Sequence, residues 1–221
     1  MADPDRLAAD RLTAERGIRI GAVPGVTLTK WTRIWTERFP RIRLHVTDLA
    51  ESEARRALDD DVIDMCFVRL PVPDDNLHLI PLYEEVPVVV VPQDHPVSLF
   101  EEVSLADLAD ETVLDPTDTA DAIDLVAGGA GVMMVPHSIA RSHSRRDLVY
   151  RPISDGTPTR IALVWRVDNP SELIEEFIGI VRGRTPNSSR AQRVQAPDKG
   201  GPPKNKAQPR PRAARPKRRS R

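Results

Sequence analysis

The order of apolar segments near the start of the chain constrains the fold more than any other feature. It predicts a strand over Ile18–Val23, a helix over Leu28–Phe39, an alternating strand over Ile42–Val46, a helix over Ser52–Leu58 and a strand over Ile63–Val68. The last of these is almost continuously apolar, which is typical of a strand buried on both faces. Strand, helix, strand, helix, strand in this order indicates an α/β fold with a parallel, doubly wound sheet.

The rest of the body continues the α/β pattern. Further strands are predicted at His78–Leu82, Val86–Val91, Thr112–Leu114, Val132–Val135, Leu148–Ile153 and Ile161–Val167. Further helices are predicted at Ser104–Asp107, where an acid three residues after a serine forms a capping pair, at Ala122–Ala127, and after Asn169-Pro170.

The last segment, residues 185–221, differs from the body in charge and composition. It holds twelve Lys and Arg, one acid and seven prolines, so its net charge is +11 while the rest of the chain sums to −12. Such a segment cannot join a core, and we expect a disordered basic tail. Its basic residues predict non-specific, salt-sensitive contact with DNA. The expected contacts are Arg210, Arg212, Arg215, Lys217, Arg218, Arg219 and Arg221. The alternatives are a solubility tail or one that folds back on the acidic body.

Catalytic and metal-binding signatures are not apparent in the sequence. Cys66 is a single thiol inside an apolar run, and five scattered histidines lack zinc spacing. No serine lies in a nucleophile elbow, and Gly128–Gly131 follows a helix where a phosphate loop would precede one. We therefore expect neither an enzyme nor a cofactor. Without an export signal or a long apolar run, we expect no membrane contact and a cytoplasmic location, nucleoid-associated if the tail binds DNA.

Five local strings resemble the effector-binding (substrate-binding) domain of LysR-type transcriptional regulators. They are Ile18–Gly25, Ile63–Pro71, Val88–Pro96, Ser104–Leu108 and Leu125–Pro136, in the family's order. The resemblance covers about residues 17–182. It implies a two-lobed fold like that of the type 2 periplasmic binding proteins, with a small-molecule cleft between the lobes.

Two departures from the family pattern set the expected domains. Only residues 1–16 precede the first strand, where the family has a winged helix-turn-helix and a linker helix, and we expect a linker remnant there. Residues 115–121 replace a helix, a strand and a turn, so we expect a truncated second lobe. The expected domains are lobe I at about 17–84 and 138–184, lobe II at about 85–137, and the tail at 185–221.

The resemblance and the positions of strand ends together suggest a ligand site. A helix N-terminus offers free backbone N–H groups to an anion, Thr27 and Thr29 add hydroxyls, and Arg69 can pair with a carboxylate. The expected ligand-binding residues are Pro24, Gly25, Thr27, Thr29, Arg69, Pro71, Thr117, Pro136 and His137. The alternative is that Thr27 only caps its helix and Arg69 pairs with a neighbouring acid.

Partners follow from the same resemblance. In the family the first helix of one subunit packs against the second lobe of another, which makes Trp31 and Trp35 expected dimer-interface residues. The alternative is that both rings belong to the core. The favoured function is a LysR-type effector-binding domain that acts in transcription regulation. It would bind a small anionic metabolite or a partner, as a homodimer or as a heterodimer with a LysR-type regulator. The alternatives are a degenerate scaffold without a metabolite ligand, and a binding protein unrelated to transcription.

Overall fold

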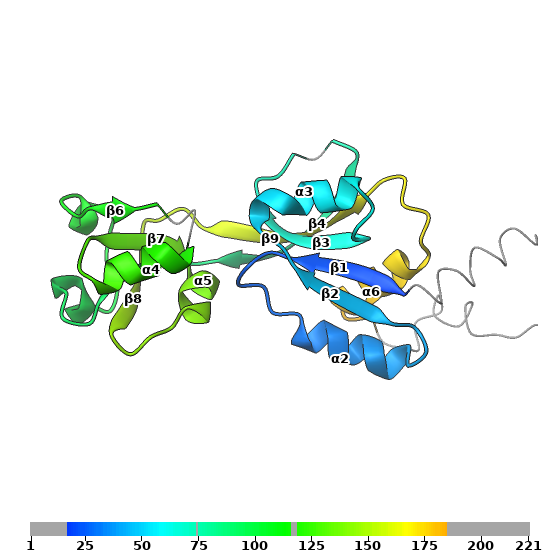
Figure 1. The fold of residues 1–221 in the computed structure, drawn as a ribbon, viewed down its shortest axis with the longest axis horizontal. Coiled ribbons are helices and arrows are strands. Elements are labelled where there is room, and N and C mark those ends of the chain that lie inside the picture. The colour runs from blue at the N-terminus through cyan, green and yellow to red at the C-terminus, as the bar shows by residue number, and fades with distance from the viewer. Residues whose placement is uncertain (1–16, 74, 116–118, 185–221) are drawn as a thin grey trace, which may run out of the picture. The chain divides into compact units, whose positions relative to one another are not determined.

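Two β-sheets with helices on their faces make up the described part of the chain (Figure 1). This computed structural model describes residues 17–73, 75–115 and 119–184, all of which belong to one of the two units into which the chain divides. The expected linker remnant, Thr117, and the tail with its seven DNA-contact residues lie outside the described residues. Within the described ranges, no helix is long and apolar enough to span a membrane.

The first sheet has the strand order β2-β1-β3-β9-β4. Its parallel part is formed by β1 (Ile18–Ala22), β2 (Leu44–Asp48) and β3 (Met65–Leu70). The antiparallel strands β9 (Thr159–Arg166) and β4 (Leu77–Glu85) complete it. The doubly wound parallel arrangement predicted from the apolar pattern is confirmed.

Helices cover both faces of the first sheet. On one face, α2 (Thr29–Arg38) and α6 (Leu173–Val181) bury a core that contains Phe67 and Phe177. On the other face lies α3 (Glu51–Asp59), whose alanines and Leu58 pack on the strands. Figure 1 shows α2 and α3 on opposite sides of this sheet. The first sheet with these three helices is called the first lobe below.

The second sheet has the order β6-β7-β5-β8. Its strands are β5 (Pro87–Pro92), β6 (Val113–Leu114), β7 (Val132–Pro136) and β8 (Leu148–Pro152), of which only β6 and β7 are parallel. The expectation that the chain returns to the first lobe near residue 138 is wrong, because β8 pairs with β5 in the second sheet.

Two helices and two single turns of 3-10 helix cover the second sheet. On one face pack α4 (Thr119–Ala127) and α5 (His137–Ser142). On the other lie η1 (Pro96–Leu99) and η2 (Ala106–Leu108). The helix α5 was not expected from the sequence. The second sheet with these elements is called the second lobe.

The second sheet repeats the first with its edge strand missing. In both sheets a parallel pair is followed by two antiparallel strands, so that β6-β7-β5-β8 matches β1-β3-β9-β4. In the first lobe α2 and β2 stand between β1 and α3. In the second lobe β6 ends at Leu114 and α4 begins at Thr119, which leaves no room for a helix and a strand equivalent to α2 and β2. This is the segment that the sequence predicts to be shortened.

Local side-chain hydrogen bonds form at two of the three predicted helix starts, although the N-cap residues are Leu105 for η2 and Glu172 for α6, neither of which has a side-chain cap hydrogen bond. Ser104 and Asp107 exchange hydrogen bonds at the start of η2, and the Asn169 side chain accepts the backbone N–H of Ser171 before α6. At α2 the prediction for Thr27 is wrong. The N-cap position is held by Leu28 without a side-chain hydrogen bond, because the first helical residue is Thr29.

Candidate ligand site

Arg69 is buried at the end of β3 and is already neutralised by acids of this chain. Its Nε donates to Glu85 Oε2 at 2.7 Å, and its Nη1 donates to Glu51. Its Nη2 donates to the carbonyl oxygen of Pro24 at 3.1 Å. The expectation that Arg69 binds a ligand carboxylate is therefore corrected. The alternative stated for it, pairing with neighbouring acids, is what the structure has, since little hydrogen-bonding capacity is left for a ligand.

Glu85 is the centre of this cluster and connects the two lobes. It accepts hydrogen bonds from Arg69 on β3, from Ser138 on α5 of the second lobe, and from Thr159 at the start of β9. Burial would raise the pKa of Glu85, but the hydrogen bonds from Arg69 and Ser138 and the Arg69 charge outweigh burial and lower it. The carboxylate is thus charged, buried and bound from both lobes.

The loop between β1 and α2 lies against the same cluster. Gly25 has a φ of +87°, and a Cβ at this position would overlap Ser138 Oγ. The loop therefore passes directly over α5, and only glycine fits this combination of backbone angle and contact. Thr27 and Thr29 are exposed beside the start of α2.

The structure brings together some of the predicted site residues and separates others. Pro24, Gly25 and Arg69 meet around Glu85. Pro71 is exposed directly after the end of β3, and Pro136 lines a cavity of the second lobe. His137 is exposed and packs near Tyr150, with ring centroids 5.0 Å apart, on the face covered by α4 and α5.

Four residues of the cluster were missed by the sequence prediction: Glu51, Glu85, Ser138 and Thr159. In the sequence, Glu85 follows the predicted strand His78–Leu82 and precedes another apolar run. It therefore resembles an ordinary polar residue of a connecting loop. Its role depends on partners sixteen residues before it and 53 residues after it in the sequence. Ser138 directly follows the predicted Pro136-His137 pair, which was the nearest available signal.

The two tryptophans of α2 have different environments. Trp35 is 0% exposed and donates its Nε1–H to the carbonyl of Ile42 at 2.9 Å, so the expected interface role of Trp35 is wrong. Trp31 is only partly buried and stacks on Phe67, with ring centroids 4.8 Å apart. Of the pair, only Trp31 has surface left for a partner.

Metal ligands and a reactive thiol are not assembled in the described part of the chain. Residues 17–73, 75–115 and 119–184 contain no group of three His, Cys, Asp or Glu side chains placed to hold a metal ion. Cys66 is buried, and burial raises its pKa to about 12, so its thiol stays protonated.

The family model described as the LysR substrate binding domain matches residues 13–124 and 117–186. The chain belongs to this family. Its two matched segments overlap at residues 117–124, next to the shortened junction between β6 and α4.

Curated relatives are transcription regulators. The Hca operon transcriptional activator HcaR of Escherichia coli is 23% identical over 83% of this chain and 73% of its own length. The regulator AlsR of Bacillus subtilis is 24% identical over 79% of this chain and 68% of its own length. CatR of Pseudomonas putida is 28% identical over 63% of this chain and 58% of its own length.

Solved structures show the same fold. The effector-binding domain of BenM with its effector benzoate superposes with a TM-score of 0.64 at 25% identity, over 75% of this chain and 90% of that one. The reduced form of OxyR has a TM-score of 0.64 at 22% identity, over 76% of this chain and 95% of that one. The predicted effector-binding-domain fold is confirmed.

Proposed function

We propose that this protein senses a small anionic metabolite between its lobes and passes the signal to transcription. The observation that supports this most is the Glu85 cluster, where a buried carboxylate bound from both lobes lies beside the loop of Gly25. A ligand on this loop would change the contact with Ser138 and so the relation between the lobes. Such a differential contact is what a ligand needs to shift a conformational equilibrium.

The start of α2 is the proposed binding surface. Its first turn has no side-chain cap, and the exposed hydroxyls of Thr27 and Thr29 lie next to it. Backbone N–H groups at a helix N-terminus favour an anion. Because Arg69 is already paired with two acids, these groups would hold the anion without a cationic partner, and we expect modest affinity.

Thermal unfolding with added ligands tests this proposal. Benzoate, which is the effector of the BenM domain, is a suitable first compound, followed by other aromatic and aliphatic carboxylates. A bound ligand raises the melting temperature with concentration. The double variant Thr27→Val, Thr29→Val should lose the shift. Thr36→Val, which removes an exposed hydroxyl later in the same helix, should keep it.

A scaffold without a metabolite ligand is the second candidate. It is favoured by the neutralisation of Arg69, because the one buried cation of the cluster serves this chain's own carboxylates. If no carboxylate shifts the melting temperature at millimolar concentration, the scaffold is the better description, and the protein would act by pairing with another regulator.

The partner surface that we propose is the exposed side of α2, in a homodimer or in a heterodimer with a LysR-type regulator. Trp31 is partly open there, and Lys30 and Arg33 are exposed beside it. Trp31→Glu should weaken association in sedimentation, with circular dichroism to confirm folding because the ring also stacks on Phe67. Unchanged sedimentation of the folded variant would contradict this surface.

The tail is the proposed DNA contact. Its charge of +11 would release counterions from a phosphate backbone, so binding should be insensitive to sequence and sensitive to salt. Full-length protein and a variant ending at residue 184 are compared by mobility shift at two salt concentrations. Equal binding by both would rule out the tail as the contact.

A further inference from the structure

A cavity of about 320 Å³ lies in the second lobe, on the face that carries η2. It is distinct from the Glu85 cluster, although Thr159 belongs to both. Its lining is Pro87, Leu105, Met134, Val135, Pro136, Ile153, Gly156, Thr157 and Thr159.

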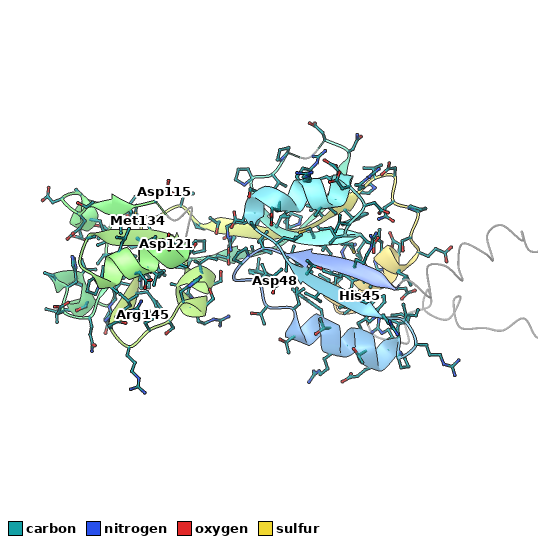
Figure 2. All side chains as sticks on the ribbon, in the orientation of Figure 1. His45, Asp48, Asp115, Asp121, Met134 and Arg145 are labelled. Atoms are coloured by element: carbon teal, nitrogen blue, oxygen red, sulfur yellow. The ribbon has the colours of Figure 1, made fainter. Side chains whose placement is uncertain are left out.

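The first lobe shows what fills the corresponding place. Phe67 on β3 pairs with Leu163 of the neighbouring antiparallel strand, and Met134 on β7 pairs in the same way with Val89. Phe67 and Met134 each face the side of the sheet opposite to α3 or α4, respectively. Trp31 of α2 stacks on Phe67. Met134, labelled in Figure 2, lines the cavity instead.

The cavity therefore lies where a counterpart of α2 would pack. The same face is open further along the second sheet, where Val113 on β6 is 46% exposed. Leu105, at the rim of the cavity, is 44% exposed. In the first lobe the strand residues that face α2, Ile20 and Ala22, are fully buried. Among the described residues, no helix covers the second sheet on this side beyond the single turns η1 and η2.

The lining selects against charged ligands. None of its side chains is ionisable, and its polar groups are the hydroxyls of Thr157, exposed at the rim, and Thr159, which donates to Glu85. Residues 86–158 hold twelve acids and four arginines, a net charge of −8, which repels anions. Asp115 and Asp121, labelled in Figure 2, belong to this acidic lobe.

The size of the cavity suits a small ring system. Ligand pockets begin at about 300 Å³, and an apolar cavity of about 150 Å³ stays dry and binds benzene. We propose that this cavity is a binding site for a small uncharged aromatic molecule of one or two rings, which takes the place that the Trp31 ring has in the first lobe. This site is separate from the anion proposed at the loop of Gly25 and does not depend on it.

Methyl NMR tests the proposal directly in the full chain. Methionines are labelled with ¹³C at the methyl group and the protein is titrated with indole, the ring of tryptophan. The Met134 methyl should shift and saturate, while the Met65 methyl in the first core should not move. Benzoate at the same concentrations should leave Met134 unchanged. A Met134 shift that never saturates, equal shifts at Met65, or equal binding of benzoate would overturn the proposal.

Variants that fill the cavity provide a second test of the proposal. Met134→Trp places an indole ring inside it and should abolish the effect of indole on the melting temperature. Leu125→Trp, at an exposed position of α4 on the opposite face, is the matched control and should keep that effect. If Met134→Trp does not fold, Leu105→Trp at the rim replaces it. Indole stabilisation that survives a folded, filled variant would locate the ring elsewhere and reject this site.

Discussion

The two lobes share one order of strands, but the second lobe has fewer of the elements that complete it. The first has five strands and buries its sheet under α2, α6 and α3. The second has the same order of strands without an edge strand and without the helix that precedes it. The second lobe keeps β5 and β8, which connect along the chain to β4 and β9 of the first lobe. An edge strand pairs on one side only, so the remaining strands of the second sheet keep their pairing without it.

Cavities and exposed apolar residues follow this difference. Phe67 in the first lobe is fully buried, while its counterpart Met134 borders a cavity. A lobe that lacks this helix thus leaves apolar surface exposed, to which a ligand or a partner can bind.

The largest expected effect on the free energy of unfolding is a difference between Phe67 and its counterpart Met134. Phe67→Ala should cost about 3–5 kcal/mol of unfolding free energy, because it removes a buried ring from contact with Trp31 and Phe177. Met134→Ala should cost about 1 kcal/mol or less, because its side chain already borders empty space. Urea unfolding of both variants measures the difference. Equal costs would mean that the second lobe is as tightly packed as the first at this position.

The next effect concerns the carboxylate that joins the lobes. Glu85→Gln should cost about 2–4 kcal/mol at pH 7, since it breaks a buried ion pair with Arg69. The folded pKa of Glu85 lies below its ordinary value of 4.5, so its contribution is complete above about pH 4.5. It is lost as the pH falls through the lower folded pKa.

The stability difference between wild type and Glu85→Gln should therefore shrink in acid. Urea unfolding from pH 7 to pH 3 measures it. Glu84→Gln is the control, because Glu84 is exposed and pairs only at the surface with Arg160, and it should change stability by about 0.5 kcal/mol or less. A difference that stays constant down to pH 3 would show that Glu85 gains nothing from its charge.

A pair of glycines gives a smaller effect. Gly25 and Gly129 both have positive φ, +87° and +76°, but a Cβ on Gly25 meets Ser138 and one on Gly129 meets nothing within 4 Å. Gly129→Ala should cost about 1 kcal/mol from backbone strain alone. Gly25→Ala should cost at least about 1 kcal/mol more. In a Ser138→Ala background that excess should fall, because the nearest atom to the added Cβ, Ser138 Oγ, is removed. An excess that persists in full would show that Ser138 Oγ is not its cause.

The smallest effect is expected at the open edge. Val113→Thr on β6 should change stability by about 0.5 kcal/mol or less, because the side chain is half exposed and no helix lies over it in the described structure. Ile20→Val in the first lobe, a smaller change at a buried counterpart, should cost about 1 kcal/mol. Thermal unfolding that reverses this order would indicate that something covers β6.

Periodicity in the sequence was enough to predict the parallel part of the first lobe, formed by β1, β2 and β3 with α2 and α3. The continuous run at Met65–Val68 reflects burial on both faces of the sheet. The alternation around Leu44 and Val46 correctly predicted a strand, although Leu44 is only partly buried and Val46 is 44% exposed. The helix α5 escaped prediction because its six residues contain only two buried apolar side chains, Ile139 and Ala140. Such a short helix is fixed by packing against β5 and β7 and not by its own pattern.

The site was predictable only in part, because its central contacts join residues far apart in the chain. Pro24, Gly25 and Arg69 were found from their places at strand ends. That Arg69 turns to Glu85 depends on β9 bringing Thr159 and β4 together, which no local signal contains. The same dependence on distant residues explains why the sequence did not distinguish the buried Trp35 from the partly buried Trp31. Spacing places both on one stripe of α2, while the depth of each ring depends on α6.

The short connection between β6 and α4 is also a suitable place to insert a designed helix and strand. The lobe already folds around the junction between Leu114 and Thr119, and the register of β6 against β7 is in place. A helix followed by a strand, inserted there with an apolar face that copies that of α2, would have a waiting sheet edge on one side and the Met134 cavity below it. Such an insertion would extend the second sheet by one strand and cover Val113 and Met134, as β2 and α2 do for the first sheet.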